Sequence, residues 1–114
     1  MSPFAQWDIV ILPFPYADKL AEKRRPGLVI SGDTLFDDHG LLWVAMITSA
    51  KNADRPGDIP IQNLKSAGLP VASLIRPSKV ATIEPARVLR RAGALPPKQQ
   101  EQVGRALRLY LESA

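Results

Sequence analysis

Apolar residues along the chain form short runs separated by proline, glycine and charged residues, a pattern typical of short strands joined by tight turns. The run WDIVILPF at residues 7–14 is rich in β-branched residues and predicts a first strand that ends near Pro13. GLVIS at residues 27–31 follows Pro26 and predicts a second strand. LLWVAMITS at residues 41–49 is almost continuously apolar, which predicts a third strand that is buried on both faces.

The second half of the chain predicts further short strands. DIPI at residues 58–61 is typical of an edge strand, because Pro60 has no amide hydrogen to donate to a ladder. VASLIR at residues 71–76 and KVATIE at residues 79–84 are either two strands or one strand that bends at Pro77.

The remaining segments predict loops and helices. Polar residues predict loops at 33–40 and 50–58, and residues 62–70 predict one helical turn that Gly68 ends. Residues 96–114 predict a terminal helix, because their apolar residues recur with helical spacing. The predicted apolar face consists of Val103, Ala106, Leu107, Tyr110 and Leu111.

These elements predict a mainly β fold of the α+β class. Five to seven short strands and one terminal helix fit a small β-barrel or curled sheet with the helix packed on it. The 114 residues are enough for one core and too few for two, so we expect a single domain over residues 1–114. The 11 prolines favour short strands with abrupt turns over a long helical bundle.

Composition narrows the classes of protein that the chain can represent. With 46% hydrophobic and 23% charged residues it is typical of a soluble globular protein. The absence of cysteine excludes disulfides, thiolate metal sites and a cysteine nucleophile. We find no signal-peptide pattern and no apolar run near the roughly 20 residues of a membrane span, so we expect a cytoplasmic protein without membrane association.

The net charge of +4 is concentrated toward the end of the chain. Residues 1–75 contain seven Lys and Arg and eight Asp and Glu. Residues 76–114 contain eight Lys and Arg but three acidic residues, all Glu. A basic surface favours a polyanionic partner, either RNA or an acidic protein segment.

Few residues suggest metal or cofactor chemistry. Asp37, Asp38 and His39 could in principle hold a metal ion, but neighbouring residues rarely converge on one ion, which favours a solvated loop. The chain has no phosphate-binding glycine loop, no dinucleotide motif and no visible Ser-His-Asp arrangement. We therefore expect no metal and no cofactor.

Three places could bind a phosphate group. The cationic run at residues 23–25 precedes the second strand, and a guanidinium there could stabilise a phosphoryl transition state. Thr48 and Ser49 end the third strand, where hydroxyls could hydrogen-bond a phosphate or cap the strand end. Arg76 could present a cation from the break before Pro77. Taken singly, each place is better explained by ordinary surface or strand-end chemistry.

The motifs DIVILPFPYAD, KRRPGLVIS, MITSA and AGLPVASLIR occur in this order along the chain. With them the sequence resembles the MazF/PemK-like toxins of type II toxin–antitoxin systems, from Trp7 to the terminal helix. The resemblance implies an SH3-like β-barrel with a C-terminal helix, usually a homodimer. It also implies a metal-independent endoribonuclease that cuts single-stranded RNA by attack of the ribose 2′-OH, and a cognate antitoxin protein that blocks the RNA site.

The resemblance assigns roles to particular residues. The RRP motif places the catalytic arginine at Arg25, and the ITS motif places the catalytic threonine at Thr48. The implied RNA-binding residues are Lys23, Arg24, Ser49, Arg76 and Ser78.

The chain departs from the family pattern at two positions. Ser78 stands where one branch has an aspartate that acts as general base, so an aspartate-based mechanism is in doubt. Trp7 replaces the usual glycine, and its indole either caps the first strand or reshapes the rim of the RNA site. Two alternatives to a ribonuclease stay open: a non-enzymatic gyrase inhibitor of the CcdB kind on the same barrel, and a barrel that binds RNA or the antitoxin without cutting.

Overall fold

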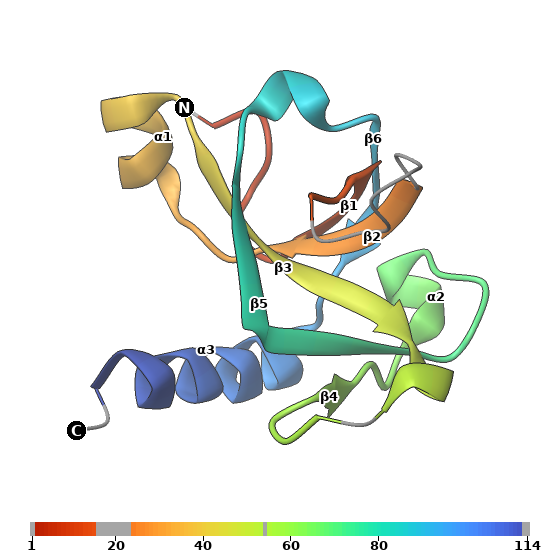
Figure 1. Cartoon of the computed structure of the whole chain (residues 1–114). Helices are drawn as coiled ribbons and strands as arrows, with labels where there is room; N and C mark the ends of the chain where they lie inside the picture. Colours follow the sequence, from red (N-terminus) through yellow and green to blue (C-terminus); the bar gives the residue numbers. More distant parts are fainter. Residues whose placement is uncertain (1, 16–23, 54, 113–114) are drawn as a thin grey trace.

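A curled antiparallel sheet forms the body of the protein, and one long helix packs against it (Figure 1). The computed structural model describes residues 2–15, 24–53 and 55–112. The strands are β1 (Asp8–Pro13), β2 (Arg24–Val29), β3 (Leu42–Ser49), β4 (Ile59–Pro60), β5 (Ser73–Ile83) and β6 (Arg90–Ala94). The helices are α1 (Asp33–His39), α2 (Leu64–Ala67) and α3 (Pro97–Glu112), and short 3-10 turns are η1 (Ala50–Asn52) and η2 (Pro85–Arg87).

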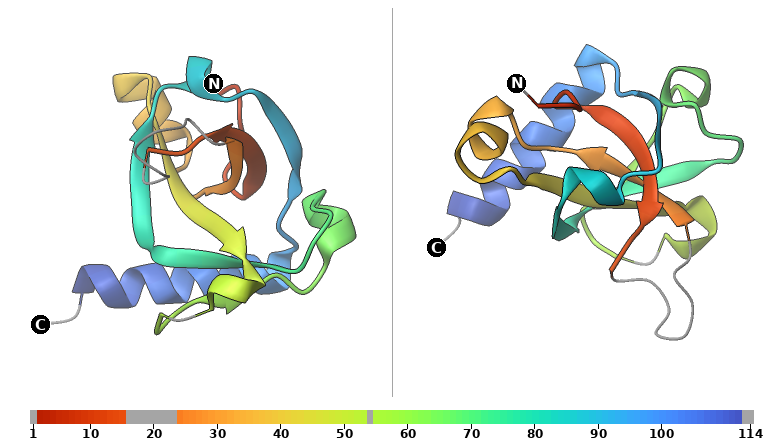
Figure 2. Two further views of the ribbon diagram at one scale, coloured as in Figure 1. Left: turned by 45° about the vertical axis from the view of Figure 1, so that its right-hand side comes forward. Right: turned by 90° about the horizontal axis from the view of Figure 1, so that it is seen from above.

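The six strands lie in the order β4-β5-β3-β2-β1-β6, and every pairing is antiparallel. The sheet curls into a half-barrel, as the turned view in Figure 2 shows. The predicted mainly β fold with a C-terminal helix is therefore confirmed, with a strand number inside the predicted range.

A single bent strand, β5, gives the sheet its corner. Met46 of β3 pairs with Arg76, whereas the preceding Ala45 pairs with Val80, so residues 77–79 bulge out of the ladder. Pro77 has no amide hydrogen to donate, which explains why the ladder breaks there. The bend directs the first half of β5 along β4, and Figure 1 shows the two halves meeting at a sharp angle. Of the two predicted arrangements, the bent single strand is the one observed.

Helix α2 packs against β6 at an edge of the curled sheet. Gly68 ends α2 with a φ of +71°, a backbone conformation that favours glycine. A Cβ atom at Gly68 would overlap the backbone of Ala92, and one at Gly93 would overlap the backbone of Ser66. The two backbones therefore pack directly on each other, which requires glycine on both sides of the contact.

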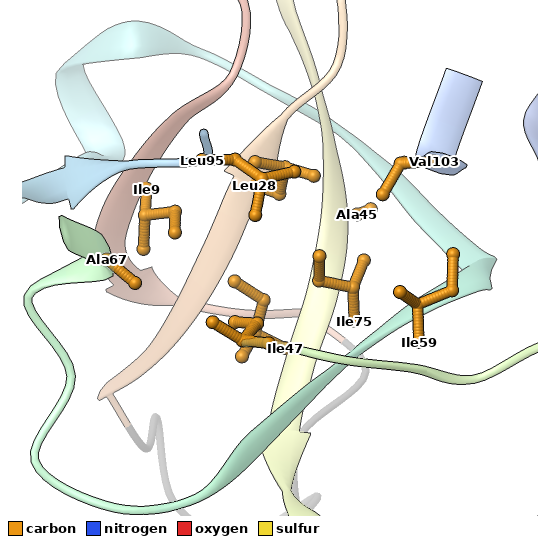
Figure 3. Close-up of a cluster of buried hydrophobic side chains, with 10 residues drawn as sticks. Ile9, Leu28, Ala45, Ile47, Ile59, Ala67, Ile75, Leu95 and Val103 are labelled. Atoms are coloured by element: carbon orange, nitrogen blue, oxygen red, sulfur yellow. The ribbon is translucent and has the colours of Figure 1, made fainter. Parts of the chain in front are cut away.

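Two hydrophobic clusters lie on opposite faces of the central strands. Successive residues of a strand point to opposite faces, so Ile9 and Val10 of β1 belong to different clusters, as do Leu28 and Val29 of β2. Figure 3 shows the cluster that α3 covers. Its buried members are Ile9, Leu28, Ala45, Ile47, Ile59, Ile61, Ala67, Ile75, Leu95 and Val103.

The buried residues of helix α3 are both in its first half. Val103 is fully buried in the cluster of Figure 3, and Gln99 is also buried. Tyr110 and Leu111 belong to the predicted apolar face, yet Leu111 is 82% exposed, because the end of the helix extends past the sheet (Figure 1). Among the described residues, no helix is both long enough and apolar enough to cross a membrane.

Two elements differ from the prediction. Residues 33–39 of the predicted loop 33–40 form helix α1; Gly40 ends it in the left-handed conformation, with its N–H donating to the Phe36 carbonyl. This helix was missed because none of its residues is buried, which leaves no apolar periodicity to detect. Strand β6 was also missed, because RRAGA has no apolar alternation and is held in place by pairing with β1.

Trp7, the residue that replaces the usual glycine, has a φ of +76°. The left-handed conformation costs a residue with a Cβ atom roughly 1–2 kcal/mol. Its backbone is fixed from both sides, because its N–H donates to Val29 and its carbonyl accepts from Leu95. The indole packs against the cluster of Figure 3, which offsets the strained backbone.

We predict that Trp7→Gly is more stable than Trp7→Ala by about 1 kcal/mol. Both variants lose the indole, but glycine alone relieves the left-handed backbone. The free energies of unfolding are to be compared by urea denaturation. The matched control is Leu109, an exposed residue inside α3. There the alanine variant should have a free energy of unfolding about 1 kcal/mol higher than the glycine variant. An alanine variant at residue 7 as stable as the glycine variant would contradict the prediction.

Candidate active site

A pocket of about 440 Å³ opens at the end of the sheet where β2 begins and β3 ends. It contains four of the residues that the sequence identified as candidates, Arg24, Arg25, Thr48 and Ser49. The rest of its lining consists of Ile11, Pro26, Ile47, Gly68, Leu69, Pro70, Val71, Ser73 and Arg90.

The strand register explains why Arg25 and Thr48 meet. The antiparallel pair aligns Gly27 of β2 with Met46 of β3. Arg25 lies two residues before Gly27, and Thr48 lies two residues after Met46, so both are at the same end of the pair. Residues two apart in a strand point to the same face, and the two side chains therefore line the same pocket.

One donor of Arg25 has no partner among the described residues. Its Nε atom is buried and makes no hydrogen bond to any residue that the structure describes. Leaving a buried donor unpaired costs about 1–3 kcal/mol, more when the group is charged. Arg25 also lines the pocket, which places its guanidinium group beside any anionic ligand that binds there.

Thr48 is almost completely buried, with 4% of its surface exposed. Its Oγ1 accepts a hydrogen bond of 2.9 Å from Nδ2 of Asn52, the last residue of η1. Ser49 lines the pocket beside it, and its Oγ accepts from the backbone N–H of Lys51 at 3.3 Å. Ser49 therefore begins η1 as an N-cap, while Asn52 at the other end of the turn reaches back to Thr48.

Arg76 is not among the residues that line the pocket. It forms a bidentate ion pair with Asp58, in which Nε donates to Oδ1 at 3.0 Å and Nη2 donates to Oδ2 at 2.8 Å. Nη2 also donates to the backbone carbonyl of Asn52 at 2.8 Å. Both side chains of the pair are 7% exposed, so the structure commits this arginine to protein contacts.

The other two candidate positions are not part of the pocket as described. Ser78 is exposed in the bulge of β5 and is absent from the pocket lining. Lys23 lies outside the described residues. The RNA-binding roles of Lys23, Arg76 and Ser78 stay predictions.

Sequence reasoning missed three residues of this region. Arg90 lines the pocket from β6, where it pairs with Ile11 of β1, but its strand was not predicted. Asn52 and Asp58 are in the predicted loop 50–58, and their contacts join residues that are 4 and 18 positions apart. The RR pair at residues 90–91 and the asparagine after ITS were visible, but the contacts depend on the fold.

The pocket has a strongly cationic wall. Arg24, Arg25 and Arg90 all line it, and the described lining residues include no carboxylate and no histidine. Among the described residues, no group of three Asp, Glu or His side chains is arranged to hold a metal ion. Asp37, Asp38 and His39 instead follow one another along α1, where successive side chains point about 100° apart.

A family model of the PemK-like, MazF-like toxins of type II toxin–antitoxin systems matches residues 5–111. The chain belongs to this family. No curated protein sequence matches the toxin.

Solved structures with the same fold are similar over nearly the whole chain. A mycobacterial endoribonuclease in complex with its cognate antitoxin is 12% identical, with a TM-score of 0.74 and 96% of each chain covered. MazF from Deinococcus radiodurans is 20% identical, with a TM-score of 0.71 and 97% of each chain covered. The Mycobacterium tuberculosis toxin MazF-mt6 is 20% identical, with a TM-score of 0.70, covering 92% of this toxin and 96% of that chain.

We predict that Asp58→Ala lowers the free energy of unfolding by about 3–5 kcal/mol, because it leaves the buried Arg76 charge without its carboxylate. The matched control is Glu101→Ala. It breaks an exposed pair in which Glu101 and Arg105 are 72% and 64% exposed, and should cost under about 0.5 kcal/mol. Equal losses of unfolding free energy in urea denaturation would show that burial of the Arg76–Asp58 pair does not raise its contribution to stability.

Proposed function

We propose that this toxin is a metal-independent endoribonuclease that cleaves single-stranded RNA in the cytoplasm and is held inactive by a cognate antitoxin. The observation that carries the proposal is the pocket in which Arg25 and Thr48 lie together on a cationic wall. Family membership supports it, as does the similarity to a mycobacterial endoribonuclease that was solved with its cognate antitoxin.

In the proposed reaction, the ribose 2′-oxygen attacks the adjacent phosphorus atom and loses its proton. The bond from phosphorus to the 5′-oxygen breaks, and this oxygen gains a proton. The products are a 2′,3′-cyclic phosphate and a 5′-OH. A flexible single strand reaches the in-line geometry for this attack, whereas the A-form duplex resists it, so we expect single-stranded RNA to be the substrate.

Arg25 acts in this proposal as the stabiliser of charge on the phosphorane. Negative charge grows on the non-bridging oxygens as the 2′-oxygen attacks, and a preoriented donor in a site of low dielectric stabilises it strongly. The guanidinium of Arg25, which lines the pocket, supplies such donors. A guanidinium holds its proton too tightly to be an efficient acid, so its role is electrostatic.

Thr48 orients the phosphate, and three other polar lining residues hold the RNA on either side of it. The Thr48 hydroxyl donates to a non-bridging oxygen, while Arg24, Arg90 and Ser49 contact the flanking backbone. Because the described lining has no carboxylate or imidazole, we assign both proton transfers to solvent, and we expect slow turnover.

A homodimer is part of the proposal. Trp43 and Tyr110 are 46% and 51% exposed, and together with Leu111 they line an apolar groove of about 540 Å³ between the sheet and the end of α3. Exposed apolar surface of this kind marks protein interaction sites, and it gives the toxin a face on which a second copy could pack.

One observation favours a second function, RNA binding without cleavage. Neither Ser78 nor the described lining of the pocket supplies the general base that one branch of the family uses. A cationic pocket without a base would still bind the RNA backbone.

We predict that the purified toxin cleaves a mixed-sequence single-stranded RNA in EDTA and leaves 2′,3′-cyclic phosphate and 5′-OH termini. Arg25→Ala should lower the single-turnover rate at least about 100-fold, the scale for loss of one preoriented donor. Thr48→Val removes a neutral donor and should lower the rate about tenfold or more. Rates and termini are measured by gel electrophoresis and end mapping.

The control for this experiment is Arg108→Ala, which removes an exposed arginine of α3 outside the pocket lining and should cleave at the wild-type rate. Intact RNA that is still bound would favour binding without cleavage. Intact, unbound RNA together with inhibited gyrase would favour a CcdB-like toxin. Cleavage that requires added metal would contradict the proposed chemistry.

We predict that Arg90→Ala weakens RNA binding by removing one phosphate contact. The logarithm of the binding constant should fall less steeply with the logarithm of salt concentration, with the slope reduced by about 0.7 for a single strand. Salt titrations of fluorescently labelled RNA measure the slope, and Arg108→Ala again serves as the control. An unchanged slope would exclude Arg90 from the RNA path.

A further inference from the structure

A chain of hydrogen bonds leads from the buried Arg76–Asp58 ion pair to the Thr48 hydroxyl, which lines the pocket. Asp58 holds Arg76 through two bonds, of 2.8 and 3.0 Å. Arg76 donates to the backbone carbonyl of Asn52 at 2.8 Å, and the Asn52 side-chain amide donates to Thr48 Oγ1 at 2.9 Å. Asn52 is thus the link between the pair and the site.

The bond from Asn52 determines what the Thr48 hydroxyl can do. A threonine hydroxyl has one proton and two acceptor lone pairs. The Asn52 amide uses an acceptor position, so the hydroxyl proton is directed away from Asn52 and is available to an acceptor in the pocket. Without this bond the hydroxyl would rotate freely between donor and acceptor arrangements.

The backbone around Asn52 is held from both ends of its turn. Ser49 caps the start of η1, and Arg76 binds the carbonyl at the end of it. Holding the backbone reduces the conformational freedom that the exposed Asn52 side chain must lose to keep its bond to Thr48. Because η1 already has its cap and Asn52 is exposed, this side chain is not required for the core.

We propose that Asn52 is a positioning residue, which holds the Thr48 hydroxyl as a donor toward the scissile phosphate. The Arg76–Asp58 pair keeps Asn52 in place, so Arg76 acts on the site without contacting RNA. This inference rests on the proposed ribonuclease function and adds to it residues that no family motif in this sequence assigns.

Two variants of similar size test the role of the amide. Asn52→Leu removes the donor. Asn52→Asp replaces it with a carboxylate that accepts a hydrogen bond from the Thr48 hydroxyl, so that the hydroxyl hydrogen points away from the pocket. Both should lower the single-turnover cleavage rate about tenfold, as expected for loss of one oriented neutral hydrogen bond. For the uncharged Asn52→Leu, RNA affinity should stay within about twofold of wild type, because the side chain orients Thr48 rather than binding RNA.

A double-mutant cycle separates positioning from a structural role. In a Thr48→Val background the hydroxyl is gone, so Asn52→Leu should change the residual rate less than about twofold. A structural role would instead lower the rate equally in both backgrounds. Thermal melts of all variants establish that each one is folded.

The outcomes distinguish this inference from the proposed function. If the wild-type toxin does not cleave RNA, the proposed function is wrong. If it cleaves but Asn52→Asp keeps the full rate, the Thr48 proton is not needed in the pocket and the positioning role is wrong. Equal losses from Asn52→Leu in the two backgrounds would also overturn it.

Discussion

A buried pair of opposite charges, Arg76 and Asp58, joins the parts of the molecule on which the pocket depends. Removing both charges from water is costly, and the cost is offset because each oxygen of the carboxylate accepts a bond from the guanidinium. Arg76 sits at the edge of the β5 bulge, and Asp58 directly precedes β4. The pair therefore fixes the corner of the sheet and, through the carbonyl of Asn52, the turn that follows Thr48.

The site combines a rigid frame with an excess of positive charge. The frame comes from β2 and β3, whose register brings Arg25 and Thr48 to one end of the sheet. The charge comes from three arginines, two on β2 and Arg90 on β6. The absence of acidic groups from the described lining makes the pocket better suited to stabilising a phosphate than to exchanging protons with it.

The strands with apolar runs were predictable from sequence, because burial of β1, β3 and β5 leaves a pattern in the chain. Strand β6 was not, since its position depends on pairing with β1 rather than on its own residues. Arg25 and Thr48 were found through family motifs, and the fold brings them to one pocket. The role of Arg76 was harder to foresee, because its partner Asp58 is 18 positions away and no local pattern connects them.

The position of β1 between β2 and the edge strand β6 has a consequence for synthesis of the toxin. β1 pairs with β2 on one side and with β6 on the other, although β6 is made much later. Until residues 90–94 leave the ribosome, one edge of β1 stays unpaired, and Leu95 and Val103 are missing from the cluster around Ile9. Arg90 reaches the pocket at the same late stage. The pocket therefore gains its complete described lining only after Arg90 has been synthesised, long after Arg25 and Thr48.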